Sequence, residues 1–266
     1  MNISPLTDQN APAALAYLRA WPYRNALLLA NVAQLRARCD VLVAERGARI
    51  LGLASTYHDL PMPNMVFAAE RDDVAAALIT ALAARNPALH DAPIMALLPE
   101  RRFRQLGRIA QIDTHQIEYQ LGVEPETLRP PVAPAACRLT NDDLPAMTRL
   151  AAAVGLAVWH EGALEIGPAW GCFVGSELVA MAATHFATPK IIEIGHVATH
   201  PNHRRQGYAS ACTAALTQAA FALAPRVFLM VLDDNHAARA TYRQLGFHPI
   251  DRFYLTTFRL RTSVIR

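Results

Sequence analysis

The sequence predicts two tandem α/β domains, each built on a β-sheet with helices packed beside it. Three observations lead to this prediction. A chain of 266 residues, with 53% hydrophobic and 18% charged residues, is globular and long enough for two cores of ordinary size. Four prolines fall within 124–136, which indicates an extended linker between the halves 1–123 and 137–266. Each half also contains short strands with helices between them, in the same order.

The second half gives the clearer pattern of elements. A turn at Gly175 and Ser176 joins the two strands of a hairpin, and glycines follow two of the helices. In chain order we expect a strand at 137–140, a helix at 141–155, a hairpin at 169–186, a strand at 190–199, a helix at 205–223, a buried strand at 226–232, a helix at 235–246 and a strand at 252–260.

The first half repeats this order in a weaker form, which suggests an internal duplication. We expect a helical region at 14–37, a hairpin at 40–57 with Gly47 at its turn, a strand at 65–70, a helix at 72–86, a strand at 93–98, a short helix at 100–108 and a strand at 113–121. One feature is missing from this copy. The connection between 65–70 and 72–86 has no glycine and no cluster of arginine and glutamine.

Bulk composition excludes several classes of protein. The formal net charge of +3 is too small to indicate a nucleic-acid-binding protein. The four cysteines lie far apart without a CxxC pair, so we expect no disulfide framework and no zinc site, and a reducing cytoplasm fits best. The N-terminus lacks a basic region followed by an apolar run, and no apolar window is long enough to span a bilayer. We therefore expect a cytoplasmic protein without a membrane partner.

One segment, HPNHRRQGYASACTAAL at 200–216, combines positive charge with a glycine at the expected start of a helix. The first N–H groups of a helix have no intrahelical partner and carry the positive end of the helix dipole. A glycine there allows close approach, and Arg204 and Arg205 add charge. The segment therefore predicts an anion site, although a solvated basic helix start would look the same.

Two motifs together resemble the GCN5-related N-acetyltransferase (GNAT) superfamily. The first is R-x-x-G-x-A at 204–209, and the second is N-x-x-A-x-x-x-Y-x-x-L-G-F at 235–247. The resemblance covers about 136–258 and implies a mixed, mostly antiparallel sheet flanked by helices. The first half looks like a degenerate copy of the same fold without a phosphate loop, so the resemblance implies no coenzyme A (CoA) site there.

The resemblance also implies roles for individual positions. Backbone amides of the loop would hold the CoA pyrophosphate, and the preceding strand would pair with the pantetheine arm. Tyr242 occupies the usual position of the general acid that protonates the departing thiolate, and Asn235 that of a polar contact to the cofactor arm. The loop positions are Arg204, Arg205, Gln206, Gly207, Tyr208 and Ala209, and the strand positions are Val197, Ala198 and Thr199.

The general base and the acceptor pocket are less well defined by sequence. Glu193 is the first candidate base, because some family members have a catalytic glutamate at this offset from the loop; a surface glutamate paired with an arginine is the alternative. His196 follows three residues later, so strand alternation predicts that the two side chains point to opposite faces. His196 could be a base or a core histidine. Glu161 and Trp159 lie where the family shapes the acceptor pocket, although Trp159 could simply be a core residue.

The sequence thus predicts an N-acyltransferase that moves an acyl group from acetyl-CoA, or another acyl-CoA, to a primary amine in a ternary complex. The main-chain N–H of Val197 would polarise the thioester carbonyl. A small-molecule acceptor is favoured because a second domain tends to close over the cleft. A protein-lysine or N-terminal acetyltransferase, a non-catalytic acyl-CoA sensor and a structural pseudoenzyme are the alternatives. No metal is expected, and homodimer formation is left open.

Overall fold

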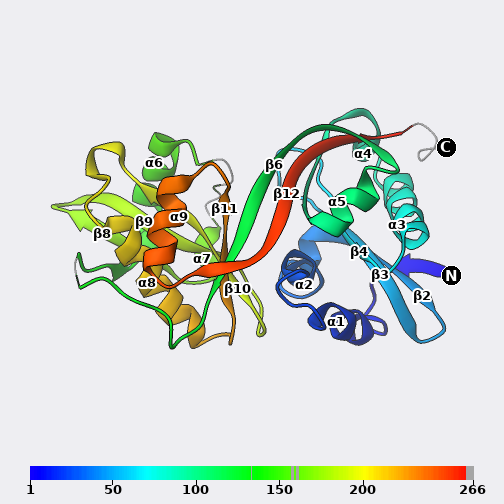
Figure 1. Ribbon diagram of the computed structural model, residues 1–266, viewed down its shortest axis with the longest axis horizontal. Helices are drawn as coiled ribbons and strands as arrows, with labels where there is room; N and C mark the ends of the chain where they lie inside the picture. Colours follow the sequence, from blue (N-terminus) through cyan, green and yellow to red (C-terminus); the bar gives the residue numbers. More distant parts are fainter. Residues whose placement is uncertain (133, 157–158, 160–161, 262–266) are drawn as a thin grey trace. The chain divides into compact units, whose positions relative to one another are not determined.

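The computed structural model describes residues 1–132, 134–156, 159 and 162–261. Figure 1 shows the order of the elements along the chain. The chain forms two compact units. The first unit comprises Met1–Glu118 with Asp251–Arg266, and the second comprises Tyr119–Ile250.

The first unit contains a four-stranded antiparallel sheet in the order β1-β2-β3-β4. The last part of the chain pairs with β5, since Phe253–Phe258 lie opposite Ile94–Pro99. The elements of this unit are β1 (Asn2–Pro5), α1 (Ala11–Arg19), α2 (Ala26–Val32), η1 (Arg36–Arg38), β2 (Cys39–Arg46), β3 (Arg49–Tyr57), β4 (Val66–Ala69), α3 (Asp72–Arg85), α4 (Ala88–Asp91), β5 (Ile94–Pro99), α5 (Glu100–Leu106) and the first part of β6 (Ala110–Val123).

Burial along β3 shows that both faces of the first sheet are covered. Every residue from Ile50 to Thr56 is buried, so the strand is apolar on both sides rather than alternating. Helix α3 contributes one face of the core through residues such as Leu78 and Leu82, which pack with Phe67 of β4.

The second unit is built on β7 to β11, with the second part of β6 beside β11. Strands β10 and β11 pair in parallel, whereas the pairs β7–β8, β8–β9 and β9–β10 are antiparallel. Its elements are β7 (Cys137–Arg138), η2 (Asn141–Asp143), α6 (Leu144–Val154), α7 (Ala163–Ile166), β8 (Ala169–Val174), β9 (Glu177–Ala187), β10 (Ile192–Thr199), η3 (Pro201–His203), α8 (Tyr208–Phe221), β11 (Val227–Leu232), α9 (His236–Gln244) and the first part of β12 (His248–Leu260). The mixed, mostly antiparallel sheets flanked by helices confirm the predicted fold class.

Most predicted elements are present, with one clear error in the first unit. The region 14–37 is not one helix, because the chain leaves α1 after Arg19 and α2 begins only at Ala26. Pro22 explains the break, since proline lacks the N–H donor and its ring disfavours helical backbone at the residue before it. The sequence pattern also missed β1.

The unit boundaries differ from the predicted division at 124–136. Strands β6 and β12 each divide between the units, so that Asp251–Arg266 belongs to the first unit rather than to the second. The segment after β6 lies within the second unit and is held against the end of α9. The Arg129 N–H donates to the carbonyl of Leu245 at 3.0 Å. Gly246 makes this approach possible, since a Cβ there would lie 2.0 Å from the Thr127 carbonyl oxygen.

Within the described residues, no helix combines the length and the apolar character needed to cross a membrane.

Candidate functional site

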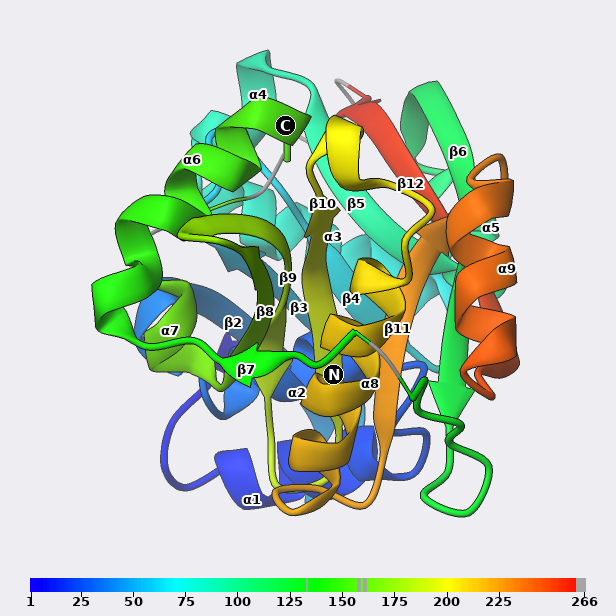
Figure 2. The same cartoon turned by 90° about the vertical axis from the view of Figure 1, so that its left-hand side faces the viewer.

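Strands β10 and β11 separate at the centre of the second unit. Their parallel pairing ends at Ile194 and Leu229, although β10 continues to Thr199 and β11 to Leu232. Figure 2 shows the two strands diverging toward their C-terminal ends, with α8 lying beside them. The main-chain groups at the end of β10 are therefore not used by the parallel neighbour.

The end of β10 is also irregular on its other side. Pairing with β9 shifts register between Gly195 and Ala198, which indicates a bulge, and His196 in this bulge has φ of 49°. The Thr199 hydroxyl is buried and has no hydrogen-bond partner among the described residues. Such an unsatisfied polar atom is expected where a ligand binds.

The loop before α8 forms an open helix N-terminus. Gly207 is the N-cap residue with φ of 83°, and Arg205 has φ of 62°, so both adopt left-handed backbone. Among the described residues no side chain caps α8, so its first N–H groups, including those of Tyr208 and Ala209, are available to a ligand. This geometry suits an anion, as the sequence predicts.

The charges of this loop strengthen the site. Arg204, Arg205 and Gln206 are exposed, and neither arginine forms an ion pair with the part of the chain that the structure describes. The dipole of the 14-residue helix adds to their positive potential. The loop therefore has both the donors and the charge that a pyrophosphate requires.

Asn235 and Tyr242 lie at the start and the end of α9. The Asn235 side chain caps the helix, since its Oδ1 accepts from the Ala238 N–H at 3.1 Å, and its amide nitrogen stays a possible donor. Tyr242 is only 7% exposed, and burial raises its pKa to about 12. Its hydroxyl makes no hydrogen bond within the described chain, and it stays protonated at neutral pH. Tyr242 can therefore donate a proton but cannot act as a base there.

Glu193 is buried beside a histidine that the sequence analysis did not select. Its Oε1 lies 3.0 Å from Nδ1 of His185 on β9, so it does not form the surface pair with an arginine that was the alternative. The ring centroid of His185 lies 5.0 Å from that of His196. Glu193 and His196 therefore contact the same imidazole, and the prediction that they point to opposite faces is wrong. Bulges after Glu193 and Gly195 break the strand alternation.

The acceptor-pocket candidates are only partly described. Trp159 lies edge-on to His196, with centroids 5.3 Å apart, and its Nε1–H donates to the Thr148 hydroxyl at 3.1 Å. It also packs on the core cluster of α6 and β9, so it connects the core with His196. Glu161 lies outside the described residues.

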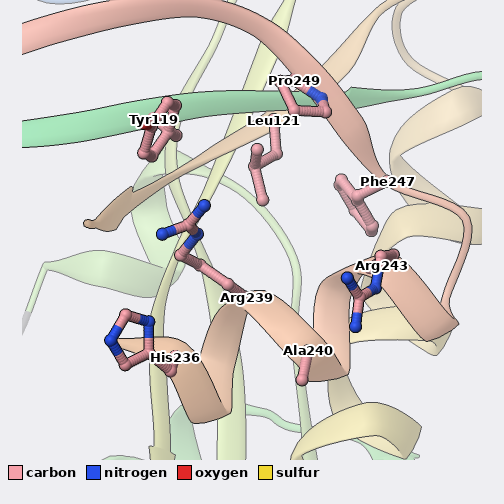
Figure 3. Close-up of a pocket in the computed structure, with 8 residues that line it drawn as sticks. All are labelled: Tyr119, Leu121, His236, Arg239, Ala240, Arg243, Phe247 and Pro249. Atoms are coloured by element: carbon pink, nitrogen blue, oxygen red, sulfur yellow. The ribbon is translucent and has the colours of Figure 1, made fainter. Parts of the chain in front are cut away.

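A separate pocket of about 350 Å³ lies between α9 and the second part of β6 (Figure 3). Its basic side chains are His236, Arg239 and Arg243 on α9. The Arg239 guanidinium lies 4.6 Å from the centre of the Tyr119 ring and 2.6 Å from Asp233, so its charge is already compensated. None of the predicted site residues lines this pocket.

No group of three or more metal-ligating side chains occurs among the residues described.

Comparisons with known proteins identify a family match and several similar folds. Residues 141–247 match the Acetyltransferase (GNAT) family. No curated protein matches the sequence. Among solved structures, a tandem GNAT protein from the clavulanic acid biosynthesis pathway is 17% identical with a TM-score of 0.69, covering 96% of this chain and 97% of its own.

Two further structures have the same fold. A Drosophila melanogaster protein is 15% identical with a TM-score of 0.69, covering 97% of this chain and 98% of its own. A GCN5-related N-acetyltransferase from Sphaerobacter thermophilus is 14% identical with a TM-score of 0.67, covering 96% and 94%. These likenesses extend over both units, whereas the family match lies within the second half.

Proposed function

Because residues 141–247 form a GNAT-family domain, we propose that the protein transfers an acyl group from acetyl-CoA to the primary amine of a small molecule. The family supports acyl transfer from acetyl-CoA in general. The proposal adds three things to the family match: the donor that this chain uses, the class of its acceptor and the roles of its residues.

The open N-terminus of α8 is the observation that carries the proposal. Its uncapped N–H groups and the exposed side chains of Arg204 and Arg205 fit the pyrophosphate of CoA. The separation of β10 from β11 leaves Val197, Ala198 and Thr199 beside the loop to receive the pantetheine arm. Asn235 would add a polar contact from the start of α9.

The bound donor supplies the acyl thioester, and the protein supplies positioning and proton transfer. Alignment of the amine with the carbonyl would account for much of the rate. The Val197 N–H, in the bulge of β10, would polarise the carbonyl oxygen. Tyr242 would protonate the departing thiolate, since burial keeps its phenol in the protonated form.

The base would come from the pair formed by Glu193 and His185, which are in hydrogen-bond contact. An alkylammonium must lose a proton before it can attack, so a base or a water chain leading to one is required. His196 and Trp159 would form part of the wall of the acceptor site.

A small-molecule acceptor is supported by one likeness. The tandem GNAT protein whose likeness covers 96% of this chain is described as coming from the clavulanic acid biosynthesis pathway, which makes a small molecule.

The cysteines support a reducing compartment such as the cytoplasm. All four are free thiols, and the sulfurs of Cys172 and Cys212 lie 3.5 Å apart without a bond between them.

Calorimetric binding of acetyl-CoA to the wild type and to Gly207→Glu tests the proposed donor site. Glutamate would place a negative charge and a side chain in the loop, so we expect at least a 100-fold loss of affinity, or about 2.7 kcal/mol. Gly175→Glu is the matched control, because Gly175 has φ of 60° in an exposed hairpin turn with open space around it. Equal affinity of the wild type and both variants, or no binding by the wild type, would contradict the proposal.

A panel of acceptors then tests the acceptor class. It contains small primary amines, a lysine peptide and a peptide with a free N-terminus, and released thiol is the readout. Turnover confined to the peptides would contradict the small-molecule assignment and leave the transferase assignment intact.

A further inference from the structure

We propose that His185 is the catalytic base and that Glu193 is a positioning residue that acts through it. This inference rests on the proposed function and assigns the two members of the buried pair to different roles. It concerns a histidine on β9 that neither motif of the family resemblance contains.

Solvent exposure distinguishes the two side chains. The Glu193 side chain is 6% exposed, whereas that of His185 is 35% exposed. A substrate amine that enters from solvent can therefore reach the imidazole, while the carboxylate lies behind it. The hydrogen bond of 3.0 Å between Oε1 and Nδ1 connects the buried group to the accessible one.

The chemistry of this hydrogen bond fixes the tautomer of His185. An ionised carboxylate only accepts hydrogen bonds, so the proton of the neutral imidazole must lie on Nδ1. The lone pair is then on Nε2, the ring nitrogen away from Glu193. A carboxylate that orients a histidine in this way also stabilises the imidazolium that forms when the histidine takes a proton.

The position of His185 places it next to the proposed reaction centre. A Cβ on Gly195 would lie 2.9 Å from the His185 Cβ, so only glycine lets the imidazole approach β10 at this point. The ring contacts His196, which directly precedes Val197 in the bulge. The titratable groups whose contacts with the ring are described, Glu193 and His196, both come from β10.

The proton balance of the proposed step is complete. A C–N bond forms between the amine and the acyl carbon while the thioester C–S bond breaks. The attacking ammonium loses two protons in all. One passes to Nε2 of His185 and then to solvent, and the other replaces the proton that Tyr242 gives to the thiolate. No oxidant, metal or further co-reactant is needed.

Nitrogen-15 NMR of the full chain with labelled histidine tests the positioning role without an acceptor. The His185 signals are assigned by their loss in His185→Gln. We expect the neutral Nδ1–H tautomer in the wild type and a shift toward Nε2–H in Glu193→Gln, because the amide no longer selects a donor at Nδ1. The Nε2–H tautomer in the wild type would overturn the proposal.

Thiol release with two acceptors tests the catalytic role. Butylamine is an ammonium ion at neutral pH and needs a base, whereas hydroxylamine is largely uncharged. For His185→Gln we expect kcat with butylamine to fall by about 100-fold, an unchanged KM for acetyl-CoA and a much smaller loss with hydroxylamine. His248→Gln is the matched control, since His248 also lies near a carboxylate, 3.6 Å from Glu124, and should leave both rates unchanged.

The outcomes separate this inference from the proposed function. Turnover of both amines at the wild-type rate by His185→Gln, or equal losses with both, would overturn the role of His185 alone. Binding of acetyl-CoA by the wild type without turnover of any amine in the panel would overturn the proposed transferase function and, with it, the assignment of the base.

Discussion

The helix N-termini of α3 and α8 follow corresponding strands in the two units but carry opposite charge. Helix α3 begins directly after β4 with Asp72 and Asp73 in its first turn. Arg108 pairs with Asp72, and Arg71 pairs with Asp73. In contrast, α8 begins with no acidic residue and with arginines that have no carboxylate partner in the described chain.

Helices α5 and α9 follow the next strand in each unit, and both end in a similar sequence. The two sequences differ by the hydroxyl group of one aromatic side chain. Phe103-Arg104-Gln105-Leu106-Gly107 in and after α5 corresponds to Tyr242-Arg243-Gln244-Leu245-Gly246 in and after α9. Phe103 stacks on Tyr254, with ring centroids 4.3 Å apart. The first unit thus lacks both the anion site and the phenol.

The two helix starts differ in how the positive end of the helix dipole is balanced. The acidic side chains of α3 stabilise a helix start that has no ligand to do so. Helix α8 begins after the left-handed Gly207, whereas α3 begins after the extended Arg71. The start of α8 has no acidic partner in the described chain, which is expected where a ligand supplies the charge.

The largest expected effect comes from exchanging the two aromatic residues. Tyr242→Phe should lower kcat by about 100- to 1,000-fold, because it removes the proposed acid, and should leave the affinity for acetyl-CoA unchanged. Phe103→Tyr is the matched change in the first unit and should leave kcat unchanged. Steady-state thiol release and calorimetry provide both measurements. Equal turnover by the wild type and Tyr242→Phe would contradict the role of Tyr242 as the acid. Equal binding of acetyl-CoA by both proteins without any thiol release would instead favour an acyl-CoA sensor.

A moderate effect is expected from the charges of the loop. The double variant Arg204→Ala/Arg205→Ala should weaken acetyl-CoA binding roughly tenfold, and the difference should shrink as salt is raised, since exposed charges are screened. Arg71→Ala removes an arginine from the corresponding connection of the first unit and should not change the affinity. If Arg71→Ala weakens binding as much as the double variant does, the two connections do not differ as described.

The smallest effect is expected from the acidic turn of α3. Hydrogen bonding to Arg71 lowers the pKa of Asp73, so its contribution to stability is present above the carboxyl pKa of the unfolded chain and is lost as pH falls through the folded value. Asp73→Ala should therefore slightly lower the melting temperature at pH 7, and this difference should shrink as the pH falls below the carboxyl pKa of the unfolded chain. It should create no second site for acetyl-CoA. A gain in binding would show that the acidic residues alone block the first unit.

Local signals predicted much of this molecule. Periodicity and turn residues located most strands and helices, and Gly207 with its neighbouring arginines identified the loop at α8. Effects that depend on register could not be predicted. The contact between His185 and Glu193 joins two strands across bulges, and strand alternation alone placed Glu193 and His196 on opposite faces. A histidine in the mostly apolar β9 was the only available signal.

Long-range pairing was also beyond the sequence pattern. Strand β12 follows α9 without a break, and only its pairing with β5 shows that its second part belongs to the first unit. Arg102 likewise lies in the short helix predicted at 100–108, where an arginine side chain is expected to face solvent. It instead donates to the carbonyl of Arg24 at 3.2 Å and to the Asn25 side chain.

The stoichiometry of acetyl-CoA binding tests the difference between the two units most directly. Native mass spectrometry and calorimetry of the full chain should give one acetyl-CoA per chain for the wild type and none for Gly207→Glu. Two molecules per chain, or one that persists in Gly207→Glu, would contradict the assignment of the only donor site to the second unit.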